Sequence, residues 1–280
     1  MRILVAGATG AIGRLLVPML LVDGHEVGGT SRTAEGVKAI DALGAKGLQM
    51  DAFSADSVNA ALHAFRPEVV VHQLTALGER DFAANSRLRI EGTRHLVDAG
   101  LEVGARKIVS QSISWVYEGG DTPADESVAL DDTPERAGMM AGVRGLESES
   151  ARMPEHVVLR YGALYGPGTW HERGGLIAQQ LRDGAIAAND GVTSFVHVED
   201  AARAAVAALE WPNGVVNIVD DEPAPSREWL PALATAFGEP APAVVPGRAA
   251  WERGASNRKV RTELGWTPAW PTWRTGFAPS

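Results

Sequence analysis

Short runs of apolar residues alternate along the chain with longer stretches in which apolar residues recur every three or four positions. The short runs predict β-strands at residues 3–6, 26–30, 47–50, 69–72, 107–111 and 157–160. The longer stretches predict helices at residues 11–22, 34–43, 57–65, 82–99 and 134–152. Alternating strands and helices are typical of βαβ units. We therefore expect an α/β fold with a Rossmann-type doubly wound parallel sheet, and ligands at the carboxyl ends of its strands.

The pattern changes after residue 160, where glycine and proline become frequent. Residues 193–198, 199–209 and 215–219 look like a strand, a helix and a strand that return to the main sheet. The sequence therefore predicts two parts. A Rossmann domain is expected at residues 1–161 and 192–220, and a smaller, discontinuous substrate-binding lobe at residues 162–191 and 221–280.

Charge and composition narrow the range of partners. The formal net charge of the 280 residues is −9, and a surface of that sign repels the phosphates of nucleic acids and anionic membranes. The chain has no cysteine, so neither a disulfide framework nor a thiolate metal site is expected. Glycines interrupt the apolar N-terminal segment, and no later stretch reaches the ~20 apolar residues of a membrane helix. We expect a soluble, cytoplasmic protein with a small-molecule substrate, acting as a monomer or homodimer.

The strongest motif is the stretch Ile-Leu-Val-Ala-Gly-Ala-Thr-Gly-Ala-Ile-Gly at residues 3–13. Gly7 permits a tight turn after the first strand, Gly10 lets the backbone approach a pyrophosphate, and Gly13 allows close packing of helix on strand. The N-terminus of the following helix stabilises the anion. The predicted cofactor contacts in this turn are Gly7, Ala8, Thr9, Gly10, Ala11, Ile12 and Gly13.

The second predicted strand runs into Thr30, Ser31 and Arg32 and carries no acid at its end. An acid there binds the 2′-hydroxyl of the adenosine ribose in NAD, whereas an arginine accommodates the 2′-phosphate of NADP. Arg32 can pair with phosphate in bidentate fashion and stack on adenine. This favours NADP(H). Further cofactor contacts are expected from Asp51 and Ala52 at the adenine, from Leu74, Thr75 and Ala76 at the inner ribose, and from Gln111, Tyr161 and Leu164.

These motifs and several later segments resemble the extended short-chain dehydrogenase/reductases through nearly the whole chain. The matching segments are VVVH at 69–72, EGT at 91–93, VY at 116–117, LRYGALYGPG at 159–168, SFVHVED at 194–200 and ELGWTP at 263–268. Among such enzymes the chain resembles the ketoreductases of bacterial aromatic polyketide pathways, which act on angucyclinones. The resemblance implies an NADP-dependent oxidoreductase.

The catalytic residues of that family are replaced in this chain. The family's Ser or Thr, its Tyr-x-x-x-Lys pair and its helical Asn fall on Ile113, Met139, Val143 and Arg89. No Tyr-x-x-x-Lys sequence occurs anywhere in the chain. Ser112 and Ser114 flank the serine position and are weak catalytic candidates. The usual tyrosine gives the carbonyl oxygen its proton, a contribution of ~10²- to 10⁴-fold that this chain lacks.

Activity can survive without this pair where the substrate supplies its own proton. Hydride transfer belongs to the nicotinamide, and the protein holds it against the acceptor carbon. An aromatic ketone with a neighbouring hydroxyl provides the proton internally. The expected function is therefore an NADPH-dependent ketoreductase for a bulky hydroxylated aromatic substrate in antibiotic biosynthesis. A non-catalytic NADP(H)-binding redox sensor and a nucleotide-sugar epimerase or dehydratase are the alternatives.

Residues on loops at the carboxyl ends of the strands, together with one methionine of the helix predicted at residues 134–152, are the candidates for binding this substrate. They are Ser114, Trp115, Met139, Trp170 and His171. His72 is interpreted as a structural, hydrogen-bonded histidine. Most of the tryptophans are expected to serve ordinary packing. A metal site is not expected, because no His and carboxylate cluster has ligand spacing.

Overall fold

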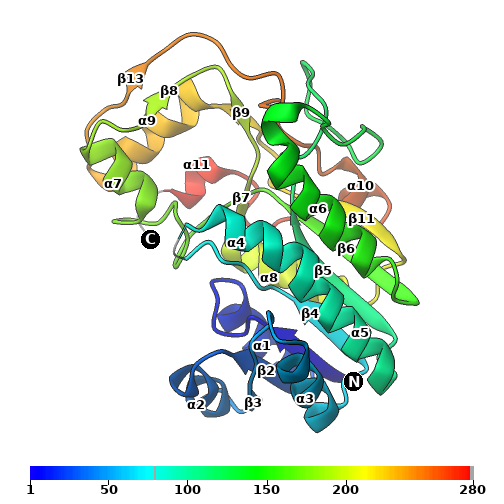
Figure 1. The fold of residues 1–280 in the computed structure, drawn as a ribbon. Coiled ribbons are helices and arrows are strands. Elements are labelled where there is room, and N and C mark those ends of the chain that lie inside the picture. The colour runs from blue at the N-terminus through cyan, green and yellow to red at the C-terminus, as the bar shows by residue number, and fades with distance from the viewer. Residues whose placement is uncertain (79, 278–280) are drawn as a thin grey trace. The chain divides into compact units, whose positions relative to one another are not determined.

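The chain forms two compact units (Figure 1), seen in a computed structural model that describes residues 1–78 and 80–277. Unit 1 comprises Met1–Ser112, Asp132–Leu159 and Ala202–Val215. Unit 2 comprises Ile113–Asp131, Arg160–Ala201 and Val216–Ser280. Each unit contains a hydrophobic cluster of its own.

A seven-stranded parallel sheet with flanking helices organises the fold, in the order β11-β6-β5-β4-β1-β2-β3. Its strands are β1 (Arg2–Ala6), β2 (Glu26–Ser31), β3 (Lys46–Gln49), β4 (Val69–His72), β5 (Lys107–Ile113), β6 (Glu155–Tyr161) and β11 (Gly214–Ile218). The first six follow the order 3-2-1-4-5-6 of a doubly wound sheet. The predicted fold class is confirmed, and all six strands predicted for it are present.

Helices alternate with these strands, and polar side chains start three of them. The helices are α1 (Gly13–Val22), α2 (Ala34–Ala42), α3 (Ala55–Phe65), α4 (Phe82–Arg87), α5 (Thr93–Val103), α6 (Ala137–Ser150) and α8 (Val198–Ala207), with a short 3₁₀ helix at Pro134–Arg136. Thr33, Ser54 and Asp81 each accept a hydrogen bond from the backbone N–H three residues later, which satisfies a free donor at the helix start.

The single helix predicted at residues 82–99 is interrupted. A π-helical segment, η1 (Leu88–Gly92), separates α4 from α5. Apolar periodicity does not distinguish a π-helical turn from an α-helical one, because both continue the same helix with a local change in hydrogen bonding. The π-helical turn contains Arg89, which the sequence analysis placed at a family position.

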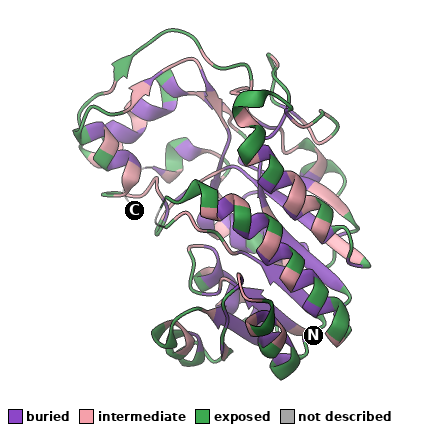
Figure 2. Cartoon of the chain, viewed as in Figure 1, coloured by how far each residue is buried: buried purple, intermediate pink, exposed green. Residues whose placement is uncertain are grey.

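The core of unit 1 lies between the sheet and its helices, and Figure 2 shows the central strands β1, β4 and β5 as almost wholly buried. Val70 of β4 and Ile108 of β5 pack with Leu62 of α3 and Leu96 of α5. Each of these side chains is fully or almost fully buried. Burial of an aliphatic side chain of this size contributes roughly 1.5–3 kcal/mol, which is what holds the helical layer on the sheet.

Unit 2 is built from short strand pairs and helices. Strands β7 (Ala163–Tyr165) and β10 (Phe195–His197) pair in parallel, β9 (Val192–Thr193) and β12 (Ala224–Pro225) pair antiparallel, and β8 (Ala187–Ala188) and β13 (Ala243–Val244) pair in parallel. The helices are α7 (Leu176–Arg182), α9 (Ser226–Phe237), α10 (Arg258–Thr262) and α11 (Trp273–Gly276).

One predicted strand pairing is wrong. Residues 193–198 were expected to return to the main sheet, but residues 195–197 form β10, which pairs with β7 in a separate two-stranded sheet. The prediction at residues 215–219 is confirmed, because β11 is an edge strand of the main sheet. An apolar run predicts that a strand is buried, and it carries no information about which strand will be its neighbour.

Aromatic side chains form most of the core of unit 2. The ring of Phe195 packs edge-on against Trp229 and Phe277, with centroids 5.1 and 5.6 Å apart. Trp273 and Tyr165 belong to the same cluster and are fully buried. Edge-to-face contacts of this kind add about 0.5–1.5 kcal/mol per pair beyond burial. Trp229 and Trp273 therefore serve packing, as the sequence analysis expected for most of the tryptophans.

Asp220, just after β11, ties the last helix of unit 2 to this core. Its carboxylate accepts hydrogen bonds from the backbone N–H of Trp273 at 2.9 Å and of Glu222 at 3.2 Å. The side chain is buried, and burial raises its pKa to about 8. At neutral pH the folded protein therefore holds a proton that the unfolded chain, with an ordinary aspartate pKa of about 3.9, releases.

We predict that the protein loses stability as the pH rises from 6.5 to 8.5. In this window the folded state binds more protons at Asp220 than the unfolded state does, so raising the pH favours unfolding. Thermal unfolding of the wild type and Asp220→Asn at both pH values measures the effect. The decrease in Tm is expected to be smaller in the variant, which has no proton to release. An equal decrease in both proteins would contradict this account of Asp220.

Candidate dinucleotide-binding and active site

The turn between β1 and α1 depends on two close backbone contacts. Gly7 has a φ of +92°, in the left-handed region that favours glycine, and its carbonyl accepts the N–H of Gly10 at 3.1 Å. A Cβ on Gly13 would lie 2.2 Å from the carbonyl oxygen of Gly7 and 2.7 Å from the Cα of Ala8. Backbone atoms cannot move aside as a side chain can, so only glycine allows α1 to begin directly at the turn.

This turn has the features of an anion-binding site. The backbone N–H groups of Ala11 and Ile12 meet no acceptor among the described residues. They precede the first turn of α1, a ten-residue helix whose N-terminus carries partial positive charge. Over Gly10, a Cβ would meet only the carbonyl of Gly7, at 3.3 Å, within the described part of the chain. The turn therefore fits the pyrophosphate of a dinucleotide.

The end of β2 is polar and cationic. Ser31 and Arg32 follow Thr30, and the carbonyl of Arg32 accepts a hydrogen bond from Nε2 of Gln49 at 3.1 Å. The Arg32 side chain is exposed, and no carboxylate in residues 1–78 or 80–277 pairs with it. Its backbone is thus held while the guanidinium stays available just before the N-terminus of α2. The guanidinium and the N-terminus of α2 both attract an anion.

The loop after β3 is held by hydrogen bonds. The N–H of Asp51 donates to Oγ of Ser57 at 3.0 Å, and the carbonyl of Ala52 accepts Nδ1–H of His95 at 2.9 Å. Asp51 is exposed and Ala52 is buried. The exposed carboxylate stands at the carboxyl edge of the sheet, where the sequence analysis placed the adenine contact.

The loop after β4 is held in the same way. The N–H of Leu74 donates to Nδ1 of His72 at 3.2 Å, and the N–H of Ala76 donates to Oδ1 of Asn85 at 3.0 Å. Leu74 and Ala76 are half-buried, while Thr75 is exposed. The backbone donors of Leu74 and Ala76 are thus occupied within the protein.

Two buried ionisable groups lie in the layer of β4, η1 and α5. Nε2 of His72 donates to Oγ1 of Thr93 at 3.0 Å, and burial together with the charge of Arg89 lowers the pKa of His72 to about 4. His72 is therefore neutral at physiological pH, in accord with its structural interpretation. Arg89 is 5% exposed, and burial lowers its pKa to about 10 against the opposing effect of Glu147.

The end of β5 packs near α6, and the side chains there are mainly apolar or already hydrogen-bonded. Oγ of Ser112 is buried and donates to Oε1 of Glu147 at 3.0 Å, and the apolar side chain of Ile113 follows it. On α6, Met139 is half-buried and Val143 is fully buried. The 14 residues of α6 include neither tyrosine nor lysine. Gln111, the remaining cofactor candidate on β5, is half-buried.

Among the candidates in unit 2, Trp115 is the more accessible side chain. It is 36% exposed, whereas the neighbouring Ser114 is buried and donates its N–H to the carbonyl of Tyr161 at 2.9 Å. The Tyr161 hydroxyl is buried and donates to the carbonyl of Ala201 at 3.0 Å. A hydroxyl held in this way serves the fold of unit 2.

The other candidates in unit 2 are aromatic. Nδ1–H of His171 donates to the carbonyl of Leu164 at 2.9 Å, and the ring lies edge-on to Trp229 at 5.8 Å. Burial lowers the pKa of His171 to about 4, so the imidazole is neutral at physiological pH. Trp170 is half-buried and packs against the aromatic core of unit 2. Unit 1 contains the predicted cofactor contacts from Gly7 to Gln111. It also contains Met139, one of the predicted substrate contacts.

Sequence reasoning missed two features of unit 1. The buried residues Ser112 and Arg89 both interact with the half-buried Glu147, and Gln73 has a buried side-chain amide with no hydrogen-bonding partner among the described residues. A signal for Gln73 was present, because it directly follows β4 between His72 and Leu74. The burial of its amide could not be predicted from the residue type.

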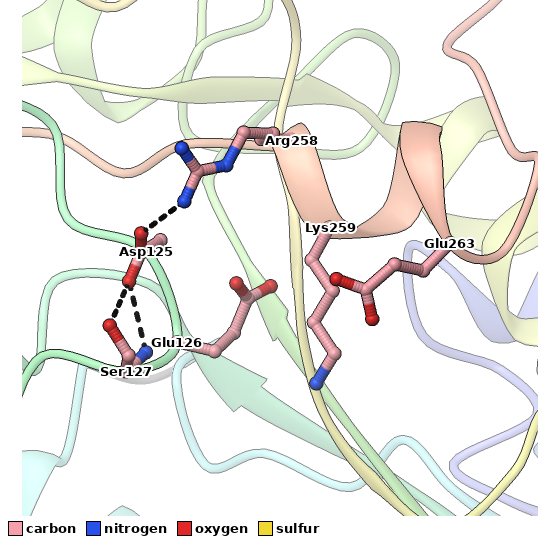
Figure 3. Close-up of a pocket in the computed structure, with 6 residues that line it drawn as sticks. All are labelled: Asp125, Glu126, Ser127, Arg258, Lys259 and Glu263. Atoms are coloured by element: carbon pink, nitrogen blue, oxygen red, sulfur yellow. Dashed lines mark hydrogen bonds and ion pairs between the residues drawn. The ribbon is translucent and has the colours of Figure 1, made fainter.

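A pocket of about 350 Å³ in unit 2 contains none of the predicted site residues (Figure 3). It lies between the loop around Glu126 and helix α10, and Arg258 pairs with Asp125 across it at 2.7 Å. Its lining residues are Asp125, Glu126, Ser127, Arg258, Lys259 and Glu263. Its lining has three carboxylates and two cationic side chains, so it has no net preference for an anionic group.

Residues 3–219 match the NAD dependent epimerase/dehydratase family. The chain is 42% identical to a 3-diazoavenalumate denitrifying reductase from a Streptomyces species over 306 aligned positions, covering 99% of both chains. It is 30% identical to a UDP-glucose 4-epimerase from Mycolicibacterium smegmatis, covering 96% of this chain and 94% of the relative. Among solved structures, UDP-glucose 4-epimerase of Thermus thermophilus in complex with NAD has 28% identity and a TM-score of 0.76, covering 96% of this chain and 94% of that chain.

The doubly wound sheet and its glycine turn define a nicotinamide dinucleotide-binding protein of the oxidoreductase type. The chain belongs to the NAD dependent epimerase/dehydratase family, within the extended short-chain dehydrogenase/reductases. The angucyclinone resemblance is not carried by these relatives. No helix in the described residues is long and apolar enough to cross a membrane.

We predict that Gly13→Ala abolishes dinucleotide binding. The new Cβ would stand 2.2 Å from the carbonyl oxygen of Gly7, so the turn must open and its N–H groups move apart. Calorimetric titration with NADPH is expected to show affinity at least ~100-fold lower, equivalent to about 2.8 kcal/mol. Gly138→Ala is the matched control, because a Cβ there meets nothing within 4 Å. Wild-type affinity in Gly13→Ala would contradict the assignment of the turn.

Proposed function

We propose that the protein is an NADPH-dependent reductase that delivers hydride to an aromatic substrate without donating a proton from the enzyme. The observation that carries this proposal is the composition of α6, which includes neither tyrosine nor lysine. We assign the family's tyrosine and lysine positions to Met139 and Val143. When bound, the reduced nicotinamide supplies the hydride. The residues of the chain bind and orient the two reactants and exclude water.

The preference for NADPH is supported by the end of β2. The end of β2 has Ser31 and Arg32 and no acid that would bind a ribose 2′-hydroxyl, and we assign the exposed guanidinium of Arg32 to a 2′-phosphate. A carboxylate would repel the phosphate, whereas Arg32 pairs with it. The pyrophosphate would be held by the turn from Gly7 to Gly13, the adenine by Asp51 and Ala52, and the inner ribose by the loop after β4.

For the substrate we propose a diazo-substituted, hydroxylated aromatic acid. The relative with 42% identity is named as a denitrifying reductase of a diazo carboxylate, and it matches this chain over 99% of its length. We assign the substrate to the lobe of residues 162–191 and 221–280, and we propose Ser114, Trp115, Met139, Trp170 and His171 as its contacts. Aromatic and thioether side chains suit a flat apolar ring.

Denitrification removes the need for an acid in the active site. An arenediazonium group carries one positive charge, and hydride brings two electrons to the ring carbon. The carbon–nitrogen bond breaks, its electron pair leaves with neutral N₂, and the new carbon–hydrogen bond completes the arene. Charge balances with no proton transferred, and NADP⁺ is the other product. Ketone reduction, in contrast, leaves an alkoxide that needs a proton.

Reduction of a hydroxylated aromatic polyketide ketone is the second candidate, because a hydroxyl beside the carbonyl would protonate the alkoxide. It is supported by the same side chains of α6. Nucleotide-sugar epimerisation, the activity named for several relatives, is not favoured, since Met139 and Val143 cannot move a proton. The third alternative is a redox sensor, which would bind NADPH and reduce no substrate.

Isotope transfer tests the proposed reaction. Purified protein is incubated with an ¹⁵N-labelled ortho-hydroxy arenediazonium carboxylate and NADPH deuterated on one or the other face of C4. We expect ¹⁵N₂ release by mass spectrometry and deuterium in the arene from one NADPH epimer only, which separates enzymatic from spontaneous reduction. A parallel incubation uses a peri-hydroxy aryl ketone in place of the diazonium compound. Deuterium in the carbinol formed from that ketone, without ¹⁵N₂ release from the diazonium compound, would establish the second candidate. Tight NADPH binding without either product would establish the sensor.

We predict that Arg32→Ser weakens binding of NADPH and leaves that of NADH nearly unchanged. Loss of one charge-assisted contact to the 2′-phosphate is worth about 1.5–3 kcal/mol, or roughly 10- to 150-fold in Kd. Titration of both coenzymes by calorimetry gives the two ratios. Lys38→Ser, on an exposed position of α2, is the control for loss of a nearby positive charge. An equal loss for both coenzymes would remove Arg32 from the phosphate site.

A further inference from the structure

The side chain of Gln73 is buried without a hydrogen-bonding partner. Gln73 directly follows β4, and its side chain is 6% exposed. Neither Oε1 nor Nε2 reaches a donor or acceptor among the described residues. A carboxamide has two donors and one acceptor, so all of its hydrogen-bonding capacity is unused.

Such an arrangement has a cost. An unsatisfied buried polar group destabilises a protein by about 1–3 kcal/mol, and the large majority of buried polar side-chain atoms have a partner. A leucine would fill similar space at this position without the penalty. Glutamine here needs a reason that the folded chain by itself does not provide.

The position of Gln73 suggests what that reason is. Its N–H donates to the carbonyl of Ala6 at 2.8 Å, which places it beside the last residue of β1. Its carbonyl carbon and oxygen both lie 2.9 Å from where a Cβ on Gly7 would be. Gln73 therefore borders the glycine turn that fits the dinucleotide.

The neighbouring backbone donors are already engaged. The N–H groups of Gln73, Leu74 and Ala76 donate to Ala6, His72 and Asn85. This edge of β4 can consequently offer a ligand little from those three backbone donors. Two side chains in this stretch still have both a donor and an acceptor to give, the exposed hydroxyl of Thr75 and the carboxamide of Gln73, and of the two only the carboxamide is buried.

We propose that the Gln73 carboxamide is a direct ligand of the bound dinucleotide, at a ribose hydroxyl. A hydroxyl donates one hydrogen bond and accepts others, and so matches the oxygen and the NH₂ of an amide at once, whereas phosphate oxygens only accept. The three rotatable bonds of the glutamine side chain let it turn from its buried position towards the ligand. The unsatisfied amide thereby destabilises the ligand-free protein and is satisfied when the dinucleotide binds.

Gln73→Leu separates this role from a structural one, because the two roles predict opposite effects on the ligand-free protein. We expect the Tm of ligand-free Gln73→Leu to be higher than that of the wild type, since an unsatisfied amide is removed. We expect its Kd for NADPH to be about 10-fold weaker, which corresponds to ~1.4 kcal/mol. The increase in Tm caused by saturating NADPH is expected to be smaller in the variant.

Two further variants sharpen the experiment. Gln73→Glu keeps the shape and the acceptors but has no NH₂, so its NADPH affinity is expected to fall as well. Gln179→Leu makes the same substitution at an exposed position of α7 and is expected to leave NADPH affinity unchanged. Differential scanning calorimetry and isothermal titration of the full chain provide all of these values without an activity assay.

The proposal rests on dinucleotide binding, and the experiment distinguishes its failure from failure of that premise. If the wild type binds NADPH and Gln73→Leu binds it equally well, the amide is not a ligand and this inference alone is overturned. If ligand-free Gln73→Leu is less stable than the wild type, the amide has a partner inside the protein, which also overturns it. If the wild type binds neither NADPH nor NADH, the proposed function and this inference are overturned together.

Discussion

The site depends on how closely α1 approaches the end of β1. With Gly7 in the left-handed region and the Gly13 backbone against the Gly7 carbonyl, the helix begins where the strand ends. The free N–H groups and the positive end of the helix then point out of the carboxyl edge of the sheet. A side chain at Gly13 would separate the helix from the turn, and one at Gly7 would push against the backbone of Gln73 in the loop after β4.

Most of the fold could be predicted from the sequence, because strand and helix periods differ and glycine spacing in the first turn has few physical explanations. The strand pairing of residues 195–197 could not be predicted, since burial pattern does not specify a partner. The environments of individual side chains were the hardest feature to predict from the sequence. Gln73 and Asn85 are both buried polar residues, but only the structure distinguishes the orphaned amide from the one that accepts the N–H of Ala76.

The substrate side was harder to predict for a related reason. Trp115 and Ser114 are neighbours in the sequence, yet one is partly exposed and the other is buried with its N–H bonded to Tyr161. The bond of His171 to Leu164 and the burial that lowers its pKa leave a neutral imidazole at physiological pH, so it can offer a substrate its ring but no positive charge. Residue type indicates which chemistry is available, whereas the surrounding contacts determine whether that chemistry can be used.

The ionisable groups nearest to the ends of β4 and β5 are poorly suited to proton donation. An efficient general acid has a pKa close to the working pH. Burial moves His72 down to about 4, so it holds no proton to give, and Arg89, at about 10, holds its proton too firmly. Glu147 stabilises the charge of Arg89 and accepts a hydrogen bond from the Ser112 hydroxyl. These polar groups therefore satisfy one another within the protein. A reaction that requires only hydride and releases a neutral leaving group makes no demand on these residues.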